Sequence, residues 1–459
     1  MLTDKVTVPV PDIVDRDVRK PLLCGPGPSD VWPSVEEAYS SPVLSPMCDE
    51  YFNVIPTILT IFPQQEDSHK NTTLPLKSHT SRKSQIKAIN STSATGSRKF
   101  YSEPANKSRV VDSYVSRPHK VNPVMADIRA GIQFIFQTRS KLVLAMSGSG
   151  HAGMEAVITN LLQPKETLLI ASRGIWDERA LRIAERYGIK TAITRVPMNT
   201  TFSLDQLEKE LKKVRPQALF ITHGDSSTGT VQNLKGLGDL CHKYGALLLV
   251  DTVVSLVGSP FLMDEWGVDG VYTSTQKALS GPAGISPLAF SDLAEKKINN
   301  RKHEPPFYLD FKLLAQQWNC YGNTRAYHHT LSPPLIWALR ACIKEVCKET
   351  LPKAWARHAS VTAHFHKRLE NLSLQFLVPK PEDRLSTVTT VVLPKGYDYL
   401  EFSKTMRANH NILIFAGLGP TAGKALRIGL MGINSTIDVA NAVADAMADT
   451  LRVLKKSSL

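Results

Sequence analysis

The chain has 459 residues, and its 42% hydrophobic and 21% charged residues are typical of a soluble globular protein. Its length predicts two or three domains, and no apolar run reaches the roughly 20 residues that a membrane-spanning helix needs. An integral membrane protein is therefore excluded, and the net charge of +13 remains as the unusual feature.

Much of that charge lies in one early segment. From Val54 to Asn122 the chain is rich in Ser, Thr and Asn and carries eleven basic and four acidic residues. Such a composition buries too little apolar surface to fold, so we expect a disordered insert over about residues 55–124. An alternative function is nucleic-acid binding through residues 54–122. The segment has few aromatic residues and no RNA-binding signature, which disfavours that alternative.

After Pro123 the sequence alternates between buried strands and amphipathic helices. We expect strands at 141–146, 166–172, 191–197, 217–224 and 246–252, and helices at 151–163, 177–188, 203–214 and 237–245. Ser203 and Gln206 form the capping box of the third helix. This alternation predicts an α/β fold with a mostly parallel, doubly wound sheet, whose ligands bind at the carboxyl ends of the strands.

The C-terminal region has a different pattern. From about Ala356 onward the helical stretches are longer, and one strand is expected at 386–394. This favours a smaller α+β domain. We expect an N-terminal arm at 1–24, a large domain at 25–348 that the 55–124 insert interrupts, and a small C-terminal domain at 349–459.

A glycine-rich turn joins the first strand to the first helix after Pro123. Its sequence, SGSGHAG over Ser147–Gly153, lets backbone N–H groups approach a phosphate at a helix N-terminus. The turn also matches the Gly-x-Gly-x-x-Gly dinucleotide fingerprint. The next strand ends without the acidic residue that holds a ribose hydroxyl, so this match is weak, and a plain strand-to-helix turn is the alternative.

Two further residues lie at strand ends. Asp251 ends an apolar strand, where a carboxylate is costly unless it meets a cation or a donor. Lys277 follows 26 residues later among small residues. Alone, Asp251 would be a cap or a structural ion pair. Together with the glycine turn, the two residues match the needs of pyridoxal 5′-phosphate: a Schiff-base lysine, an aspartate for the pyridine nitrogen and a phosphate loop.

Eight short motifs together resemble one known enzyme family. In family order they are GPGPS, SGSGHAGMEA, GIWDERA, ITHGDSSTG, LLLVDTVVSLVG, YTSTQKAL, YHHT and ALRIGLMG. They resemble the alanine–glyoxylate (serine–pyruvate) aminotransferases, which are class-V, fold-type-I pyridoxal-phosphate enzymes. The resemblance covers about Pro21 to Met447 except for the insert. It implies transamination between alanine or serine and glyoxylate or pyruvate.

The resemblance also implies roles for individual residues. Lys277 matches the Schiff-base lysine that moves the substrate proton, and Asp251 matches the partner of the pyridine nitrogen. Arg427 and Gly27 match the substrate-binding residues, and Arg427 suits the bidentate grip of a carboxylate. The remaining implied cofactor-binding residues are Ser149, Gly150, His151, Trp176, Ser226, Val253, Gln276, Tyr327 and Thr330. In the family, the residues that match Tyr327 and Thr330 reach the cofactor of a partner subunit, which implies a homodimer with shared active sites.

The chain departs from the family pattern at several positions. Ala416 stands where the family has glycine, and we expect it to crowd the pocket for the substrate carboxylate. Asp30 replaces an asparagine, and the 55–124 insert interrupts a loop and helix beside the site mouth. Pro46-Met47 stands where the insect-type 3-hydroxykynurenine transaminases carry Asn-Phe. That enzyme is the alternative within the fold, and Met47 favours the glyoxylate branch.

The cysteines and the termini bear on the cellular location. Six scattered cysteines without a CxxC pair suit a reducing compartment and predict neither a disulfide framework nor a metal site. The N-terminus has no apolar core of a secretory signal, and its acidic residues argue against a mitochondrial presequence. The final Ser-Ser-Leu partly matches the peroxisomal Ser-Lys-Leu signal, so we expect a peroxisomal or cytoplasmic location.

Overall fold

The computed structural model describes residues 7–11, 123–322 and 326–457. All of them belong to one compact unit of the chain. The predicted insert, most of the N-terminal arm, Gly27, Asp30, Pro46-Met47 and the last two residues lie outside the described residues. None of the described helices is long and apolar enough to cross a membrane.

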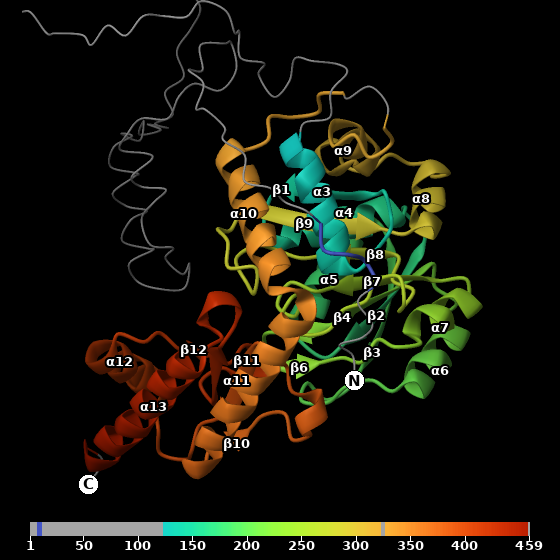
Figure 1. Cartoon of the computed structure of the whole chain (residues 1–459). Helices are drawn as coiled ribbons and strands as arrows, with labels where there is room; N and C mark the ends of the chain where they lie inside the picture. The colour runs from blue at the N-terminus through green and yellow to red at the C-terminus, as the bar shows by residue number, and fades with distance from the viewer. Residues whose placement is uncertain (1–6, 12–122, 323–325, 458–459) are drawn as a thin grey trace, which may run out of the picture. The chain divides into compact units, whose positions relative to one another are not determined.

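A seven-stranded sheet forms the centre of the larger part of this unit (Figure 1). Its spatial order is β1 (Val143–Ser147), β9 (Ile285–Phe290), β8 (Gly270–Tyr272), β7 (Leu247–Asp251), β4 (Ala218–Thr222), β2 (Thr167–Ser172) and β3 (Lys190–Arg195). Strands β8, β7, β4, β2 and β3 pair in parallel. Strand β9 runs antiparallel to both β1 and β8. The predicted mostly parallel sheet is confirmed, and β9 is an addition that the sequence analysis missed.

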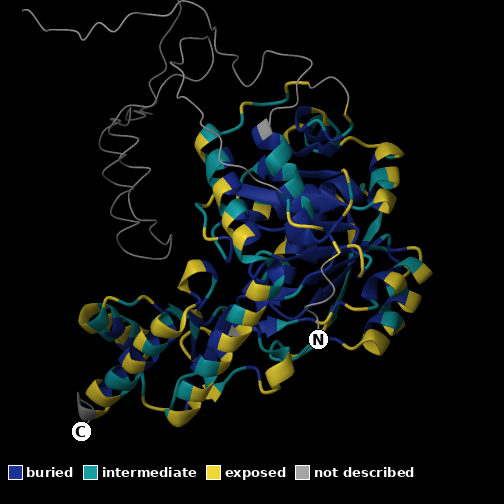
Figure 2. Ribbon diagram, in the orientation of Figure 1, coloured by how far each residue is buried: buried dark blue, intermediate teal, exposed yellow. Residues whose placement is uncertain are grey.

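The strands of this sheet are buried along nearly their whole length, except at the β3 edge (Figure 2). Such continuous apolar strands are typical of a sheet whose two faces are both covered by helices. The helices of this part are α3 (Pro123–Phe136), α4 (Gly150–Leu161), α5 (Ile175–Arg186), α6 (Leu204–Val214), α7 (Leu237–Lys243), α8 (Asp292–Asn299), α9 (Phe311–Gln317) and α10 (Pro333–Glu349).

Helix α6 begins where its capping box predicts. The Ser203 side chain accepts a hydrogen bond from the Gln206 N–H at 3.2 Å, and the Gln206 side chain accepts one from the Ser203 N–H at 2.9 Å. Both N–H groups would otherwise lack intrahelical partners. Leu207 and Leu211 then bury one face of the helix.

A second, four-stranded sheet lies toward the C-terminus. Its order is β10 (Gln375–Phe376), β11 (Val388–Val392), β13 (Ala425–Gly429) and β12 (Phe415–Ala416), and all neighbours are antiparallel. Helices α11 (Leu351–Asn371), α12 (Tyr399–His410) and α13 (Ile437–Ser457) accompany it. The side chains between them form a hydrophobic cluster separate from that of the large sheet. The predicted α+β pattern is present, while the boundary at residues 348 and 349 stays a prediction.

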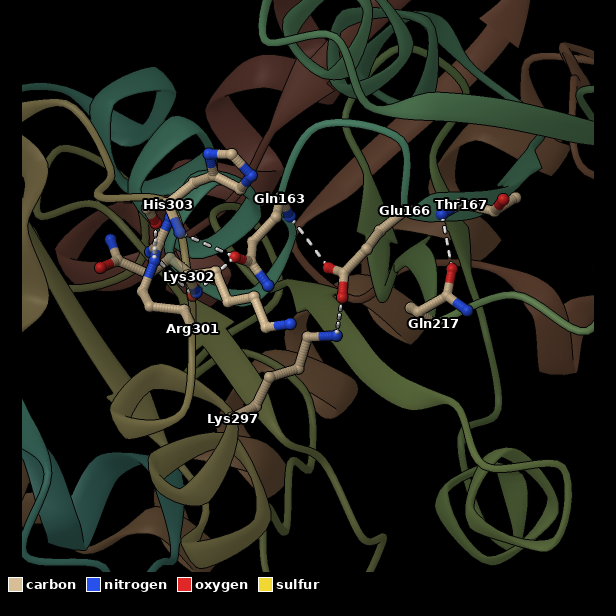
Figure 3. A network of polar contacts seen from close by, with 9 residues as sticks. Gln163, Glu166, Thr167, Gln217, Lys297, Arg301, Lys302 and His303 are labelled. Atoms are coloured by element: carbon tan, nitrogen blue, oxygen red, sulfur yellow. Dashed lines mark hydrogen bonds and ion pairs between the residues drawn. The ribbon is translucent and has the colours of Figure 1, made fainter.

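The amino end of β2 is held by a polar network (Figure 3). Glu166, just before the strand, accepts hydrogen bonds from the Gln163 N–H and from the Lys297 ammonium, both at 2.9 Å. The Gln163 side chain in turn accepts from the N–H groups of Lys302 and His303. These contacts join the end of α4 to the segment after α8. They stabilise this edge of the sheet, and the candidate functional residues lie at the opposite, carboxyl ends of the strands.

Candidate active site

The glycine turn between β1 and α4 brings the backbone close to neighbouring side chains. Gly148 adopts a φ of 141°, which side chains rarely tolerate, and its N–H donates to the Gly284 carbonyl at 2.8 Å. A Cβ added to Gly150 would meet Val253 Cγ2 at 2.9 Å, so no larger residue fits there without a shift. Ser149 begins α4 without a side-chain capping bond and is exposed. Its hydroxyl and the N–H groups of the first turn are thus available for an anion.

Asp251 is the last residue of β7, and its side chain is buried. Its Oδ1 accepts a hydrogen bond from the Val253 N–H at 2.7 Å, and its Oδ2 accepts one from the Tyr272 hydroxyl at 2.6 Å. Burial raises the pKa of Asp251 to about 7, against the effect of these two donors, and the nearby carboxylates of Asp177 and Asp225 raise it further. The site therefore contains a carboxylate whose ionised form is stabilised when a positive group approaches.

Lys277 lies in the loop between β8 and β9 and is half-buried. Burial and the positive charge of Arg427 lower the pKa of its amine, while the Asp251 carboxylate raises it. The three side chains therefore act on one another electrostatically, although they come from different elements. Within the described part of the chain the Lys277 amine has no hydrogen bond or ion pair, which leaves it available for chemistry.

Trp176 and His151 lie next to each other at the starts of two helices. Trp176 is in the first turn of α5, and its indole N–H donates to the Ser226 hydroxyl at 2.8 Å. The rings of Trp176 and His151 are 5.7 Å apart between centroids, in an edge-to-face arrangement. Burial and the charge of Arg179 lower the pKa of His151. Two of the predicted cofactor-binding residues, Trp176 and Ser226, are thus hydrogen bonded to each other.

Arg427 extends from β13 of the second sheet toward the large sheet. Its Nε donates to the Ala416 carbonyl at 2.6 Å, and its Nη1 donates to the Ser226 carbonyl at 2.7 Å. The guanidinium is therefore fixed. The resemblance assigns it to a bidentate grip of the substrate carboxylate, and two of its nitrogen atoms already donate to backbone carbonyls. Its Nη2 makes no hydrogen bond with any described residue. Ala416, expected to crowd this pocket, supplies one of the carbonyls that orient the arginine.

The other predicted residues fall into two places. Val253 contacts the glycine turn, as described above, and Gln276 precedes Lys277 and accepts a short hydrogen bond from the Ser274 hydroxyl. Tyr327 and Thr330 are both exposed, and their hydroxyls are hydrogen bonded to each other at 2.8 Å. No contact joins this pair to Asp251 or Lys277 among the described residues. Gly27 lies outside them.

Comparison with known proteins identifies the fold that carries this arrangement. The family model of class-V aminotransferases matches residues 94–441. The chain belongs to the class-V aminotransferase family. It is 43% identical to the alanine–glyoxylate aminotransferase of Rattus norvegicus, over 73% of this chain and 81% of the rat protein. It is 38% identical to the enzyme of that name from Drosophila melanogaster, over 72% of this chain and 85% of the relative.

A solved structure supports the same conclusion. The alanine–glyoxylate aminotransferase of Nostoc sp. superposes with a TM-score of 0.70 at 38% identity, covering 72% of this chain and 87% of that protein. The chain is therefore a fold-type-I, pyridoxal-phosphate-dependent aminotransferase, and its substrates are an amino acid and a 2-oxo acid. The predicted family, fold class, enzyme class and cofactor are confirmed.

The residues of this aminotransferase fit its cofactor. A flat ring with a phosphate needs an anion-binding helix start, a nearby amine, a carboxylate for the ring nitrogen and an aromatic neighbour. The tight turn at Gly150, the unpaired Lys277 amine, the buried Asp251 carboxylate and the fixed Trp176 supply one of each. A protonated ring nitrogen of the bound cofactor would compensate the buried negative charge of Asp251.

The sequence analysis missed a buried group of charges beside Asp251. Arg173 is fully buried; it donates from Nη1 to Thr230 Oγ1 at 2.8 Å and from Nη2 to the Thr222 and His223 carbonyls. Asp177 accepts from the N–H groups of Arg173 and Gly174 at 3.0 and 3.2 Å, and its pKa is raised to about 6, mainly by burial. Arg173 immediately precedes the GIWDERA motif and Asp177 lies within it, but nothing local in the sequence indicates that they are buried.

Proposed function

We propose that this aminotransferase transfers the amino group of alanine or serine to glyoxylate or pyruvate. The observation that carries the proposal is the group formed by Lys277, Asp251 and Arg427, in which a half-buried amine lies within electrostatic range of a carboxylate and a fixed guanidinium. The rat, fly and Nostoc relatives all bear the name alanine–glyoxylate aminotransferase. That shared name supports a small amino donor and glyoxylate as acceptor.

Each of the three side chains has a distinct task in the proposed reaction. Bound pyridoxal phosphate supplies an electron sink for the charge that develops when the substrate α-carbon loses its proton. The Lys277 amine holds the cofactor and later takes that proton at its Nζ. An ordinary lysine, with a pKa near 10.4, is mostly protonated at neutral pH and cannot accept it. The lowered pKa of Lys277 increases the fraction of neutral amine.

Arg427 binds the substrate carboxylate in this proposal. Its Nε and Nη1 are held by the Ala416 and Ser226 carbonyls, so its Nη2 approaches the substrate from a fixed direction. A charge-assisted hydrogen bond to a carboxylate is about twice as strong as a neutral one. The carbonyl of Ser226 orients Arg427 while its hydroxyl accepts from Trp176, so one residue links the proposed carboxylate-binding arginine to a proposed cofactor-binding ring.

We further propose a homodimer in which Tyr327 and Thr330 contact the cofactor phosphate of the partner subunit. Two observations support this arrangement. Both residues are exposed, and among the described residues their hydroxyls bond to each other and not to Lys277 of the same subunit. A peroxisomal or cytoplasmic location remains a proposal based on the final Ser-Ser-Leu. Nucleic-acid binding through residues 54–122 is the remaining alternative role, and that segment lies outside the described residues.

The closest competing activity is 3-hydroxykynurenine transamination, and donor preference decides between them. We expect kcat/KM with alanine or serine and glyoxylate to exceed that with 3-hydroxykynurenine by at least about tenfold, a difference of roughly 1.4 kcal/mol in transition-state binding. Steady-state assays of the purified full chain with each donor measure this. A higher kcat/KM for 3-hydroxykynurenine would reverse the assignment.

A lysine variant tests the reaction itself. Lys277→Ala should abolish turnover and leave no cofactor that borohydride can fix to the protein. Lys297→Ala is the matched control, because this lysine pairs with Glu166 at 2.9 Å at the opposite edge of the sheet. It should retain both properties. Borohydride fixation that persists in Lys277→Ala would show that another residue holds the cofactor.

A further inference from the structure

The buried phenol of Tyr272 touches the carboxylate that the cofactor needs. We propose that Tyr272 is a positioning residue of this aminotransferase, whose hydroxyl holds Asp251 ionised and in one orientation for the ring nitrogen of the cofactor. This inference rests on the proposed role of Asp251. Neither the sequence motifs nor the family resemblance assigned any task to Tyr272.

The contact between the two side chains is short and enclosed. The Tyr272 hydroxyl donates to Asp251 Oδ2 at 2.6 Å, and the Val253 N–H donates to Oδ1 at 2.7 Å. Tyr272 is among the largest fully buried side chains of the described residues. A hydrogen bond to a charged group is stronger than one between neutral groups, and the bond to the buried Asp251 carboxylate is of that kind. Each oxygen of Asp251 thus has one fixed donor, so the side chain cannot rotate freely.

The ring of Tyr272 is itself fixed from two sides. Its neighbouring strands are β7 and β9, which pair with β8 at Asp251 and Leu288. A Cβ on Gly153 would meet Tyr272 Cβ at 3.1 Å and Cδ2 at 3.2 Å, so α4 packs directly on the ring. The Tyr272 carbonyl accepts from the N–H and the hydroxyl of Thr252. Tyr272, which precedes Lys277 by five residues, therefore connects Asp251 with the helix that begins at the glycine turn.

The charges around Asp251 make such a donor necessary. The Asp177 carboxylate from α5 and the Asp225 carboxylate from β5 (Gly224–Asp225) both disfavour ionisation of Asp251, as does burial, which is the largest effect. The Asp251 carboxylate raises the pKa of the Lys277 amine, so a protonated Lys277 favours the ionised carboxylate, but burial and Arg427 lower the pKa of that amine. The hydroxyl of Tyr272 and the N–H of Val253 lower the pKa of Asp251. Losing the hydroxyl therefore shifts Asp251 toward its neutral form.

The test measures cofactor affinity rather than turnover, in full-length protein stripped of cofactor. Tyr272→Phe keeps the ring and its packing, so we expect a folded protein by circular dichroism. Its dissociation constant for pyridoxal phosphate should rise about ten- to a hundredfold at pH 7.5, as expected for a lost hydrogen bond to a charge. The pH below which affinity declines should also move upward, because the hydroxyl stabilises the ionised carboxylate.

The control and the double variant separate positioning from packing. Tyr187→Phe is matched, since the Tyr187 hydroxyl donates to Glu155 Oε1 at the same 2.6 Å away from Asp251. We expect this control to leave both the affinity and its pH profile unchanged. In an Asp251→Asn background, Tyr272→Phe should change the affinity by less than about twofold, since the carboxylate on which it acts is gone.

The outcomes distinguish failure of the inference from failure of the underlying role. If Asp251→Asn weakens cofactor binding but Tyr272→Phe does not, Tyr272 is only a packing residue. The same conclusion follows if Tyr272→Phe weakens binding equally in both backgrounds. If Asp251→Asn itself leaves affinity unchanged, the role of Asp251 and the inference about Tyr272 both fall. None of these results depends on which amino donor the enzyme prefers.

Discussion

Asp251 is a buried carboxylate whose ionisation lowers the stability of the cofactor-free fold. Its folded pKa of about 7 lies above its ordinary value of 3.8, so the folded state binds more protons than the unfolded state between these values. The contribution of Asp251 to stability is therefore complete below pH 3.8 and is lost as the pH rises through about 7.

This pH dependence of the stability leads to a prediction for Asp251→Asn. Without cofactor, the variant should be more stable than the parent at pH 8 by roughly 1–3 kcal/mol, because a buried charge is removed. Near pH 5 the gain should become small, and cofactor affinity should be lower at every pH. Thermal melting of the cofactor-free protein at both pH values measures this.

Asp269→Asn is the matched control for that measurement. Asp269 is also buried, but its oxygens accept from the Leu248 N–H, the Ser291 hydroxyl and His242. An amide there would lose the charge that pairs with His242, whose pKa is raised by its hydrogen bond to Asp269, so this variant should be destabilised, most at the lower pH. A destabilised Asp251→Asn protein at pH 8 would contradict the argument.

His358 makes the opposite pH contribution. It is fully buried, with Nδ1 2.7 Å from the Ala354 carbonyl and Nε2 accepting from the Gly432 N–H at 3.0 Å, so the ring is neutral. Burial lowers its pKa from 6.5 to about 4. Folding therefore favours the neutral form of His358. Its contribution to the stability is complete above pH 6.5 and is lost as the pH falls toward 4.

We therefore expect His358→Gln to reduce the acid sensitivity of the protein. The variant should lose about 2 kcal/mol of stability at pH 7.5, where the neutral ring is well bonded, and much less at pH 5. Urea unfolding at the two pH values gives the comparison. His223, whose pKa is lowered to about 3 by burial, leaves a remaining slope in the variant. An equal loss at both pH values would mean that His358 acts by packing alone.

At the scale of elements, α3 and α10 are joined by a buried ion pair. The Nε and Nη2 atoms of Arg340 both donate to Asp127 Oδ2, at 2.9 and 2.7 Å, and both side chains are at most 10% exposed. Removing one partner of a buried ion pair is strongly destabilising and typically costs about 3–5 kcal/mol. This contact holds the first described helix against α10.

Asp127→Ala should accordingly lower the stability by about 3 kcal/mol and the melting temperature by several degrees. Glu210→Ala is the control, because Glu210 and Lys213 are 3.8 Å apart on an exposed helix face, where ion pairs contribute little. Thermal melts of the two variants should differ clearly. Equal melting temperatures would show that the α3–α10 pair does not matter for the fold.

Helix boundaries show how far local patterns reach. The start of α6 follows from its capping box, which involves only residues three positions apart. Helix α5 begins at Ile175, two residues before the predicted position. Its first turn is organised by Asp177, which also accepts from the Thr222 hydroxyl of β4. That partner is distant in the sequence, so a local pattern could not include it.

At the scale of the whole molecule, the proposed dimer can be tested by mixing two inactive variants. Lys277→Ala lacks the amine, and Tyr327→Ala lacks the exposed phenol proposed to reach the partner's site. If Tyr327 acts across the interface, a mixed dimer contains one site with both defects and one intact site. Unfolding and refolding an equal mixture should then restore about a quarter of the parental activity.

Two measurements complete that test. Light scattering at the assay concentration should give the mass of two chains, and each variant refolded alone should stay inactive. If mixing restores no activity although mixed dimers form, Tyr327 serves its own subunit. A fully active monomer would remove the shared site altogether.

The sequence by itself determined the alternating fold, the family and its cofactor. Strand alternation depends on nearest neighbours in the chain, and the glycine turn, Asp251 and Lys277 are recognisable because each lies at or shortly after the end of an apolar strand. The antiparallel β9 escaped notice because its short apolar run contains Pro287, which is unfavourable for a strand interior.

Only the tertiary structure decided which side chains control these groups. Tyr272 and Asp251 meet because β7 and β8 are neighbours in the sheet, and Arg427 reaches Ser226 from a strand of the second sheet 201 residues away along the chain. Burial and long-range pairing set the pKa values of Asp251 and Lys277. Both effects depend on how distant segments pack, and the local sequence around each residue contains no record of that packing.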